Sequence, residues 1–390
     1  MDARARHTFF VTCAPGLEAL LHAELRDLRL SKLERQVGGV RFEGRLEDAW
    51  TVNLWSRIGI RVLLRLARFQ AATGDALHAA ALEIPWHLYL ASDGTFRVDA
   101  QTSESALDHS HFVEQRVKDA VADAFRARHG VRPSVDLETP HLWIHVHLFR
   151  DRCTISADTS GESLHKRGWR RYQGRAPLAE TLAAAVVLES GWDRRSPLLD
   201  PFCGSGTILV EAALLAEGSA PGSFGRPFGF ETWPGHDAEA WRTLVQRARD
   251  GARFPAKLVL RGRDADAVAV EGARSNAAAA GLEGKLELEV GDLTDFEPRR
   301  GWNAWIVTNP PYGERVGRGA DLHSLYRRFG SILRERCGGY RVAVLSGNPA
   351  LSSALGIEPA RRTAVRNGPL ECELLGFDVP ALSSKPNELR

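Results

Sequence analysis

From Pro177 onward the sequence alternates short apolar runs with longer amphipathic segments, and this rhythm limits the possible folds more than any other feature. Strands that alternate with helices favour a mostly parallel, doubly wound sheet with helices on both faces. We therefore expect an α/β fold over residues 177–390, closed by a pair of strands within 361–379. The helices expected are 178–190, 207–216, 267–280 and 322–336, and the strands are 198–199, 258–260, 286–290, 304–307 and 341–345.

The first part of the chain has a different pattern. Residues 1–160 mix short strands and helices without an obvious nucleotide loop, which indicates a separate α+β module. Period-two alternation predicts a strand over 142–149, and apolar residues at helical spacing predict a helix over 112–128. Residues 219–256 interrupt the later rhythm with glycine, proline and aromatic residues. We expect this insertion to be a covering element or a substrate contact.

Composition excludes several classes of protein. The 51 basic and 49 acidic residues give a net charge of +2, so any nucleic-acid contact must come from a local patch. The five cysteines are scattered and form no C-x-x-C pair, which argues against a disulfide framework or a structural zinc site. No apolar run near the middle of the chain is long enough to cross a bilayer, and no secretory leader is evident. We expect a cytoplasmic monomer without a metal ion or a membrane anchor.

The segment Asp200–Thr207 (DPFCGSGT) stands where the first strand of the α/β region gives way to a helix. Open α/β sheets bind ligands at such strand ends. Gly204 and Gly206 allow a tight turn and a close backbone approach, and Asp200 can accept hydrogen bonds from an ammonium group. The loop lacks the third glycine of a dinucleotide fingerprint and the Gly-Lys-Ser/Thr of a phosphate loop. It suits an adenosine ligand with an amino-acid tail better than a pyrophosphate.

Two further carboxylates follow the next strands. Asp264 is expected at a strand end where an acidic residue can bind ribose hydroxyls, whereas Asp266 could be only a helix cap. Asp292 follows the strand after that, where its carboxylate could accept from an adenine amino group. Each signal is weak alone, but the order of the motifs along successive strands favours one shared site.

Asn309-Pro310-Pro311-Tyr312 directly follows the apolar strand AWIVT. The two prolines fix the backbone and present the Asn309 side chain and the Pro310 carbonyl at the edge of the sheet. Two acceptors suit an exocyclic amine on a planar base, because they can turn its conjugated lone pair toward an incoming methyl group. Tyr312 can stack on the base and hold the line of attack, which is catalysis by positioning.

A basic stretch joins the two halves of the chain. Basic residues interleaved with aromatics can bind single-stranded nucleic acid by neutralising phosphates and stacking on bases. The other interpretation is a solvated linker with a packing tryptophan. The basic residues proposed to contact RNA are Lys166, Arg167, Arg170, Arg171 and Arg175, with Trp169 and Tyr172 among them.

These motifs resemble the THUMP-domain guanine-N2 RNA methyltransferases. DPFCGSGT and NPPYGER carry the likeness, and SLHKRGW, APLAETLAAA, FGFETWPGHDAEAW and RNGPLEC are of the same type. Within the family the likeness is closest to the enzymes that modify 23S rRNA and lack a fused second methyltransferase. It implies a ferredoxin-like region over 1–55, an RNA-binding THUMP domain over 56–160, a basic linker over 161–176 and a class I (Rossmann-like) methyltransferase domain over 177–390.

The resemblance also implies S-adenosylmethionine as methyl donor and gives roles to the residues. Around the methionine part of the donor it places the first loop, namely Asp200, Phe202, Gly204 and Gly206, with Thr207 beside them. Asp264 would hold the ribose and Asp292 the adenine amino group. Asn309 and Pro310 would orient the guanine amine, with Pro311 fixing the corner and Tyr312 stacking on the base.

Several functions stay open. The preferred one is methylation of a guanine N2 in 23S rRNA, with rRNA or a large-subunit precursor as partner. A tRNA guanine-N2 methyltransferase would use the same domains. An NPPY loop also serves enzymes that methylate DNA adenine or a protein glutamine amide. A non-catalytic RNA-binding factor would need none of the motif carboxylates, which are all intact here.

Overall fold

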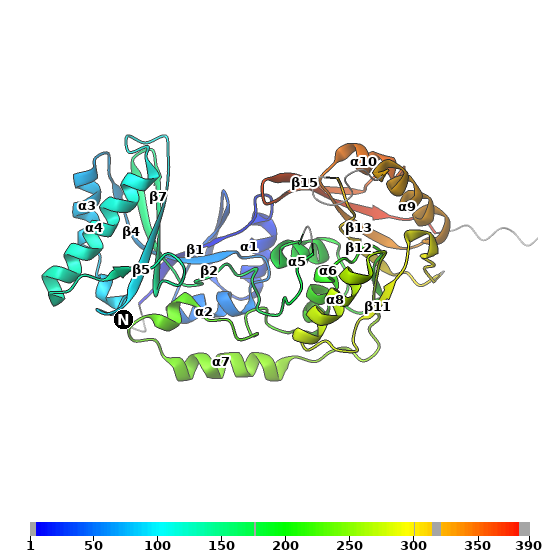
Figure 1. The fold of residues 1–390 in the computed structure, drawn as a ribbon, viewed down its shortest axis with the longest axis horizontal. Helices are drawn as coiled ribbons and strands as arrows, with labels where there is room; N and C mark the ends of the chain where they lie inside the picture. Colours follow the sequence, from blue (N-terminus) through cyan, green and yellow to red (C-terminus); the bar gives the residue numbers. More distant parts are fainter. Residues whose placement is uncertain (1–4, 175–176, 300, 314–320, 382–390) are drawn as a thin grey trace, which may run out of the picture. The chain divides into compact units, whose positions relative to one another are not determined.

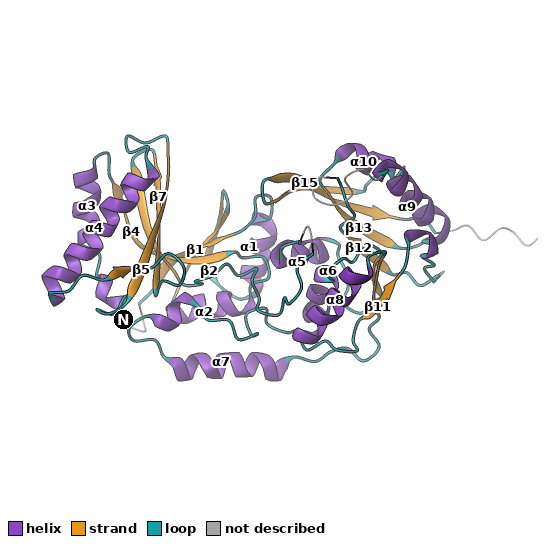
Figure 2. Cartoon of the chain, in the orientation of Figure 1, coloured by secondary structure: helices purple, strands orange, loops and turns teal. Residues whose placement is uncertain are grey.

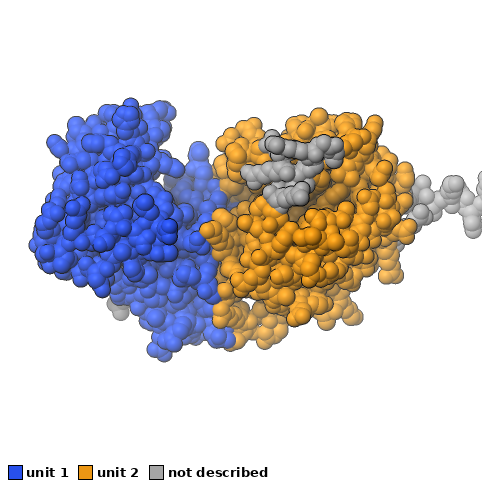
Figure 3. All heavy atoms as spheres, in the orientation of Figure 1, with its two compact units in different colours: residues 1–13, 21–164, 225–247 blue, residues 14–20, 165–224, 248–390 orange. Residues whose placement is uncertain are grey.

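A computed structural model describes residues 5–174, 177–299, 301–313 and 321–381. The chain divides into two compact units (Figure 3). Each unit has a sheet of its own. Unit 1 comprises residues 1–13, 21–164 and 225–247, and unit 2 comprises residues 14–20, 165–224 and 248–390. Within the described residues, every helix is too short or too polar to cross a membrane.

Unit 1 is built on an eight-stranded sheet in the order β2-β3-β1-β4-β8-β7-β5-β6. Helices pack on one face of it; α3 and α4 lie beside β4, β5 and β7 in Figure 2. The strands are β1 (His7–Thr12), β2 (Ser31–Gln36), β3 (Gly39–Gly44), β4 (Arg61–Gln70), β5 (Thr95–Ser103), β6 (Ser134–Val135), β7 (Leu142–Phe149) and β8 (Arg152–Asp158). The helices are α1 (Glu18–Asp27), α2 (Leu46–Trp55), α3 (Gly74–Leu82), the 3-10 turn η1 (Trp86–Leu88) and α4 (Ser110–His129).

The alternation of β7 explains how this sheet holds its helices. Leu142, Ile144, Val146 and Leu148 are all buried, whereas the residues between them are partly or fully exposed. Successive side chains of a strand point to opposite faces, so β7 turns its aliphatic side chains toward the helices and its other side chains away. The strand and helix expected at 142–149 and 112–128 are therefore confirmed, the helix within two residues at its start and one at its end.

The middle of the aromatic insertion, residues 225–247, belongs to unit 1 and covers part of it. Its short turn η2 (Gly229–Thr232) brings Phe230 onto Trp50 of α2, with ring centroids 5.5 Å apart. Trp241 of α7 (Ala238–Gly251) meets Phe230 edge to face at 5.0 Å. Buried aromatic pairs of this kind contribute about 0.5–1.5 kcal/mol beyond their burial, which explains why the insertion is rich in aromatic residues.

Unit 2 has a seven-stranded sheet in the order β11-β10-β9-β12-β13-β15-β14. The first five strands of this order run parallel, and β15 and β14 join antiparallel at the edge. Helices α5, α6 and α8 cover one face and α9 and α10 the other (Figure 1). The strands are β9 (Leu198–Asp200), β10 (Leu260–Asp264), β11 (Glu287–Val290), β12 (Trp305–Thr308), β13 (Arg341–Ser346), β14 (Arg361–Asn367) and β15 (Leu370–Asp378). The helices are α5 (Glu180–Glu189), α6 (Thr207–Glu217), α8 (Ala267–Ala279), η3 (Leu293–Asp295), α9 (Leu322–Arg336) and α10 (Pro349–Ala354).

The doubly wound sheet and its closing strand pair are thus confirmed. One strand prediction was wrong in position: β10 runs from Leu260 to Asp264, not over 258–260. Arg261 and Arg263 can lie in a strand because β11 supplies their partners, with Glu287 and Glu289 at 2.6 and 2.8 Å. The correction matters for function, because it makes Asp264 the last residue of its strand.

Candidate active site

A cavity of about 320 Å³ opens at the carboxyl ends of β9, β10, β11 and β12. The strand order reverses between β9 and β12, and ligands of open α/β sheets bind at such a switch point. All four sequence motifs meet there. The predicted residues that line the cavity are Asp200, Phe202, Gly204, Thr207, Asp264, Asp292, Asn309, Pro310, Pro311 and Tyr312. Gly206 does not line it; this residue is the N-cap of α6.

The glycine loop needs both of its glycines for backbone reasons. Gly204 and Gly206 have φ values of 50° and 77°, in the left-handed region that other residues rarely adopt. A Cβ on Gly206 would also lie 2.9 Å from the Cβ of Ala273 on α8. The backbone N–H of Gly204 donates to Asp264 Oδ2 at 2.9 Å. Asp264 therefore fixes the loop, and Asp266 is a helix cap that accepts from the N–H of Val268.

Asp200 is a buried carboxylate whose hydrogen-bond donors among the described residues are neutral. Its Oδ1 accepts from Thr308 Oγ1 at 2.6 Å and from the N–H of Phe202 at 3.2 Å. Burial raises the pKa of Asp200 to about 7, despite these two hydrogen bonds. Burial likewise raises the pKa of the neighbouring Cys203 thiol well above its ordinary value, so this thiol stays protonated and is not a nucleophile.

Asp292 is more exposed and behaves in the opposite way. Its Oδ1 accepts from the backbone N–H and the hydroxyl of Thr294, at 2.8 and 2.7 Å. These hydrogen bonds to Thr294 hold the pKa of Asp292 below its ordinary value. Of these two carboxyls, Asp200 titrates near neutrality and Asp292 stays ionised.

The Asn-Pro-Pro-Tyr corner leaves one acceptor unused. Asn309 Oδ1 is buried and has no hydrogen-bond partner among the described residues. An unpaired buried acceptor costs about 1–3 kcal/mol, so a retained one points to a ligand donor. Tyr312 is fixed nearby, because its hydroxyl accepts from Asn367 Nδ2 at 3.1 Å.

The turn between β14 and β15 supplies wall residues that the motif analysis did not assign. Asn367 and Leu370 line the cavity. They belong to the stretch RNGPLEC, which resembles the family in sequence but carries no predicted site residue. Because the turn lies more than fifty residues after Tyr312 in the chain, its place beside the tyrosine follows from the antiparallel β14–β15 edge.

The structure corrects part of the predicted RNA contact. Arg167 has a side chain that is 2% exposed and pairs with buried Glu211 at 3.3 Å, so its guanidinium cannot meet a phosphate. Arg170 also turns inward and pairs with Glu180 at 2.7 Å. Trp169 is buried and cannot stack on a base.

The remaining basic residues of this stretch that the structure describes are not buried as Arg167 and Arg170 are. Lys166 and Arg171 are exposed, and Arg175 lies outside the described residues. Arg170 instead holds the start of α6, because its Nη2 donates to Thr207 Oγ1 at 3.2 Å and to the carbonyl of Leu178 at 2.7 Å. In the parts of the chain that the structure describes, no group of three His, Cys, Asp or Glu side chains is placed to hold a metal ion.

Sequence families divide the chain in three. Residues 8–63 match the RlmL ferredoxin-like domain, and residues 71–158 match the THUMP domain. Residues 167–375, more than half of the chain, match the family described as RMKL-like, methyltransferase domain. The chain belongs to this methyltransferase family. The ferredoxin-like, THUMP and Rossmann-like architecture expected from the sequence is confirmed.

Relatives of this methyltransferase are similar over nearly its whole length. Ribosomal RNA large subunit methyltransferase K/L of Syntrophotalea carbinolica is 43% identical to this chain. The match covers 97% of this chain and 54% of that protein. The chain thus spans about half the length of this relative. A Synechocystis protein named "Putative RNA methyltransferase slr0064" is 38% identical, and the match covers 95% of this chain and 96% of that protein.

Two solved structures share the fold over nearly the whole chain. The structure described as "SMU.472, a putative methyltransferase complexed with SAH" matches with a TM-score of 0.89 and 30% identity. The match covers 97% of this chain and all of that one. A Listeria monocytogenes protein described as a predicted N6-adenine-specific DNA methylase matches with a TM-score of 0.86 and 32% identity, over 96% of this chain and 97% of that one.

Proposed function

We propose that this methyltransferase transfers a methyl group from S-adenosylmethionine to the exocyclic N2 amine of a guanine in 23S rRNA. The observation that carries the proposal is the buried, unpartnered Oδ1 of Asn309 in the same cavity as Asp200. An aromatic amine supplies the N–H that this oxygen lacks. The names of the K/L relatives support the choice of large-subunit rRNA, and the THUMP match supports RNA as the substrate class.

The cavity residues fit the donor. Asp200 has no cationic partner among the described residues, and an ammonium group would supply one. The Gly204 loop would face the methionine part, Asp264 the ribose hydroxyls and Asp292 the adenine amino group. When bound, S-adenosylmethionine supplies a methyl group on a sulfonium, with neutral S-adenosylhomocysteine as the leaving group. The structure of SMU.472 with SAH supports the same cofactor here.

The chain's own part in the transfer is positioning. Asn309 Oδ1 and the Pro310 carbonyl accept hydrogen bonds from the two N–H groups of the amine, which turns the nitrogen lone pair out of conjugation with the ring. Tyr312 stacks on the base, and Asn367 holds the tyrosine by its hydroxyl. Fixing the nucleophile in line with the methyl group lowers the barrier without a strong general base. The methylated nitrogen is cationic and acidic, so it loses its extra proton to water after the transfer. The guanine must first leave any duplex, because pairing uses the same amine.

Transfer of labelled methyl to separate substrates tests the proposal. The protein is incubated with methyl-labelled donor and, in parallel, with unmodified 23S rRNA, total tRNA, DNA and protein, and the labelled nucleoside is identified. The proposal predicts N2-methylguanosine in 23S rRNA. The same nucleoside in tRNA alone would favour the tRNA enzyme, and label in DNA alone would favour the activity for which the Listeria protein is named. No label in any pool would favour a binding factor.

A further inference from the structure

A second cavity, of about 1200 Å³, lies entirely within unit 1. It occupies the sheet face opposite the helices and is lined by side chains of strands from β1 to β8. On β7 its walls are Trp143, His145, His147 and Phe149, the residues that alternate with the buried aliphatic ones. One groove therefore runs over strands from both the ferredoxin-like and the THUMP parts of the sheet.

The groove is strongly basic. Its lining includes six arginines, Arg41, Arg61, Arg65, Arg68, Arg150 and Arg152, against two carboxylates, Glu34 and Asp99. Three of the arginines are neutralised: Arg41 pairs with Glu34 at 2.9 Å, Arg150 pairs with Glu104 at 2.8 Å, and Arg61 pairs with Asp158. Arg65, Arg68 and Arg152 form no ion pair with any described carboxylate.

A β-bulge brings two of these three arginines to the same face. In a regular strand, residues three apart point to opposite faces. The register of β4 against β8 shifts between Arg65 and Ala67, and Arg65 and Arg68 both line the groove. Bulges commonly re-aim a side chain in this way. Burial, and then the charges of Arg68 and Arg41, lower the pKa of Arg65, and the opposing effect of Glu43 is smaller.

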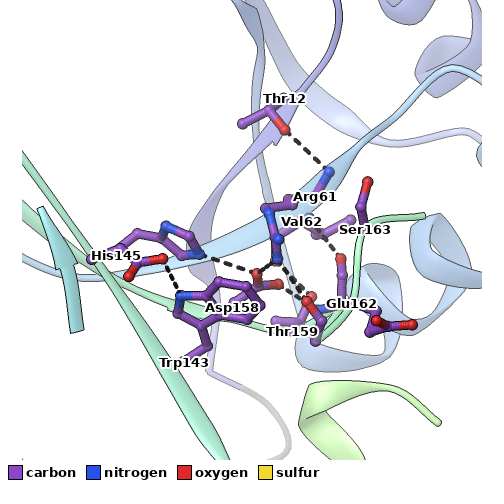
Figure 4. Close-up of polar contacts among 12 residues, drawn as sticks. Thr12, Arg61, Val62, Trp143, His145, Asp158, Thr159, Glu162 and Ser163 are labelled. Atoms are coloured by element: carbon purple, nitrogen blue, oxygen red, sulfur yellow. Dashed lines mark hydrogen bonds and ion pairs between the residues drawn. The ribbon is translucent and has the colours of Figure 1, made fainter. Parts of the chain in front are cut away.

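One end of the groove is rigid. Asp158, fully buried, accepts from Arg61 and from His145 Nε2, the latter at 3.2 Å (Figure 4). The Arg61 guanidinium lies 4.2 Å from the centre of the Trp143 ring, and the indole N–H donates to Asp99 at 2.7 Å. Trp143 is thereby fixed as part of the wall.

Two other aromatic residues of the lining are partly exposed, Phe149 at 39% and Phe10. The Arg150 guanidinium lies 4.8 Å from the centre of the Phe149 ring, so a base would stack on the other face of that ring or displace Arg150. Base–aromatic stacking is worth about 1–3 kcal/mol per base, and it requires bases that are not paired in a duplex. Arginines without carboxylate partners beside open aromatic rings suit a single-stranded polynucleotide better than an acidic peptide, which has no bases to stack.

We propose that this groove binds a single-stranded segment of the RNA substrate, with phosphates at Arg65, Arg68 and Arg152 and a base on Phe149. The inference rests on the proposed function for the identity of the polyanion. It adds a binding surface that lies outside the methyl-transfer cavity.

The test uses the full chain and a fluorescent 12-nucleotide single-stranded RNA. The triple variant R65Q/R68Q/R152Q is compared with R26Q/R128Q/R132Q, which removes the same charge from exposed arginines of unit 1 outside the groove. We expect the groove variant to bind at least tenfold more weakly, and the slope of log Kd against log salt to fall by about two, since each phosphate contact on a single strand contributes about 0.7. The control triple should change both quantities much less.

A second variant separates stacking from charge. F149A should weaken binding of the single strand about tenfold and leave the salt slope unchanged. Equal loss in both triple variants, an unchanged slope in the groove triple, or equally tight binding of polyglutamate would overturn the proposal. Melting temperature and SAH affinity of each variant report on folding. Groove-dependent RNA binding without RNA methylation by the wild type would refute the proposed function alone, whereas RNA methylation unaffected by the groove triple would refute the groove alone.

Discussion

The side-chain amide of Asn276 donates to the carbonyl oxygen of Ser205 at 3.0 Å, so a buried residue of α8 holds the loop that lines the donor cavity. Its Oδ1 accepts the backbone N–H groups of Arg171 and Tyr172, at 2.7 and 2.9 Å. A single amide therefore joins the basic stretch to the glycine loop. The basic stretch therefore acts as a clamp that holds the glycine loop in place.

Replacing Asn276 by alanine is expected to loosen that loop. The change leaves several backbone groups without partners, which should lower the free energy of unfolding by about 2–3 kcal/mol and weaken SAH binding about tenfold. Titration calorimetry and chemical denaturation measure the two quantities. Glu271→Ala, an exposed position on the same helix, is the control. A folded Asn276→Ala protein with wild-type SAH affinity would contradict the clamp.

Gly347→Ala tests how Tyr312 is held. A Cβ at residue 347 would lie 3.0 Å from two ring carbons of Tyr312, so the ring must move. Because small misplacements at a reacting centre are expensive, kcat should fall about ten- to hundredfold while SAH affinity stays constant. Gly251→Ala is the control, since a Cβ there meets nothing within 4 Å. An unchanged kcat in Gly347→Ala would remove Tyr312 from the positioning role.

The buried pair Arg167–Glu211 should matter for stability rather than for RNA. Arg167→Met removes the cation that pairs with buried Glu211 and is expected to cost about 3–5 kcal/mol, and the second change Glu211→Leu should recover most of it. Denaturant unfolding of the two variants gives the comparison. Neutralising exposed Lys166 instead should change stability by less than about 0.5 kcal/mol. If the double variant is fully folded yet shows a reduced salt slope of RNA binding, Arg167 contacts RNA after all.

Asp200 predicts a pH dependence of donor binding. Its pKa of about 7 in the free protein means that it must lose a proton below that pH before it can pair with an ammonium group. The affinity for S-adenosylmethionine should therefore rise with pH up to about 7 and level off above it. In the ligand-free protein the raised pKa has the opposite effect on stability: this group's contribution is present at acidic pH and lost as pH rises toward 7.

Calorimetry from pH 5.5 to 8 measures the dependence. Asp200→Asn should bind the donor more weakly and with no pH dependence in this range. A wild-type affinity that is flat across pH 7 would show that Asp200 does not pair with a cation on the donor.

The sequence predicted the methyltransferase sheet well because its signals are local. The apolar strand before Asn309 and the glycines after Asp200 identify strand ends by themselves, and carboxyl ends of parallel strands meet at one edge. The meeting of four distant motifs in one cavity follows from that rule. Asn367 could not be placed in this way, because its contact with Tyr312 depends on an antiparallel edge pair.

The RNA contact predicted for Arg167 and Arg170 was wrong because it depends on partners that are distant in the sequence. A run of arginines looks solvated unless its partners are known, and Glu211, the partner of Arg167, lies 44 residues away on α6. The groove of unit 1 could not be predicted from the sequence either. It is lined by residues from strands between β1 and β8, and it depends on a bulge in β4. Patterns along one strand do not carry such information.

The proposed role of Asn309 is to orient the substrate amine, and single-turnover methyl transfer by Asn309→Ala tests this role most directly. With unmodified 23S rRNA and saturating labelled donor, the rate should fall at least about a hundredfold, as expected when a group that acts only in positioning is removed. SAH affinity, measured on the same preparation, should stay within about twofold of the wild type, since a positioning group for the amine leaves the donor's contacts intact. A wild-type rate of transfer in this variant would contradict the account.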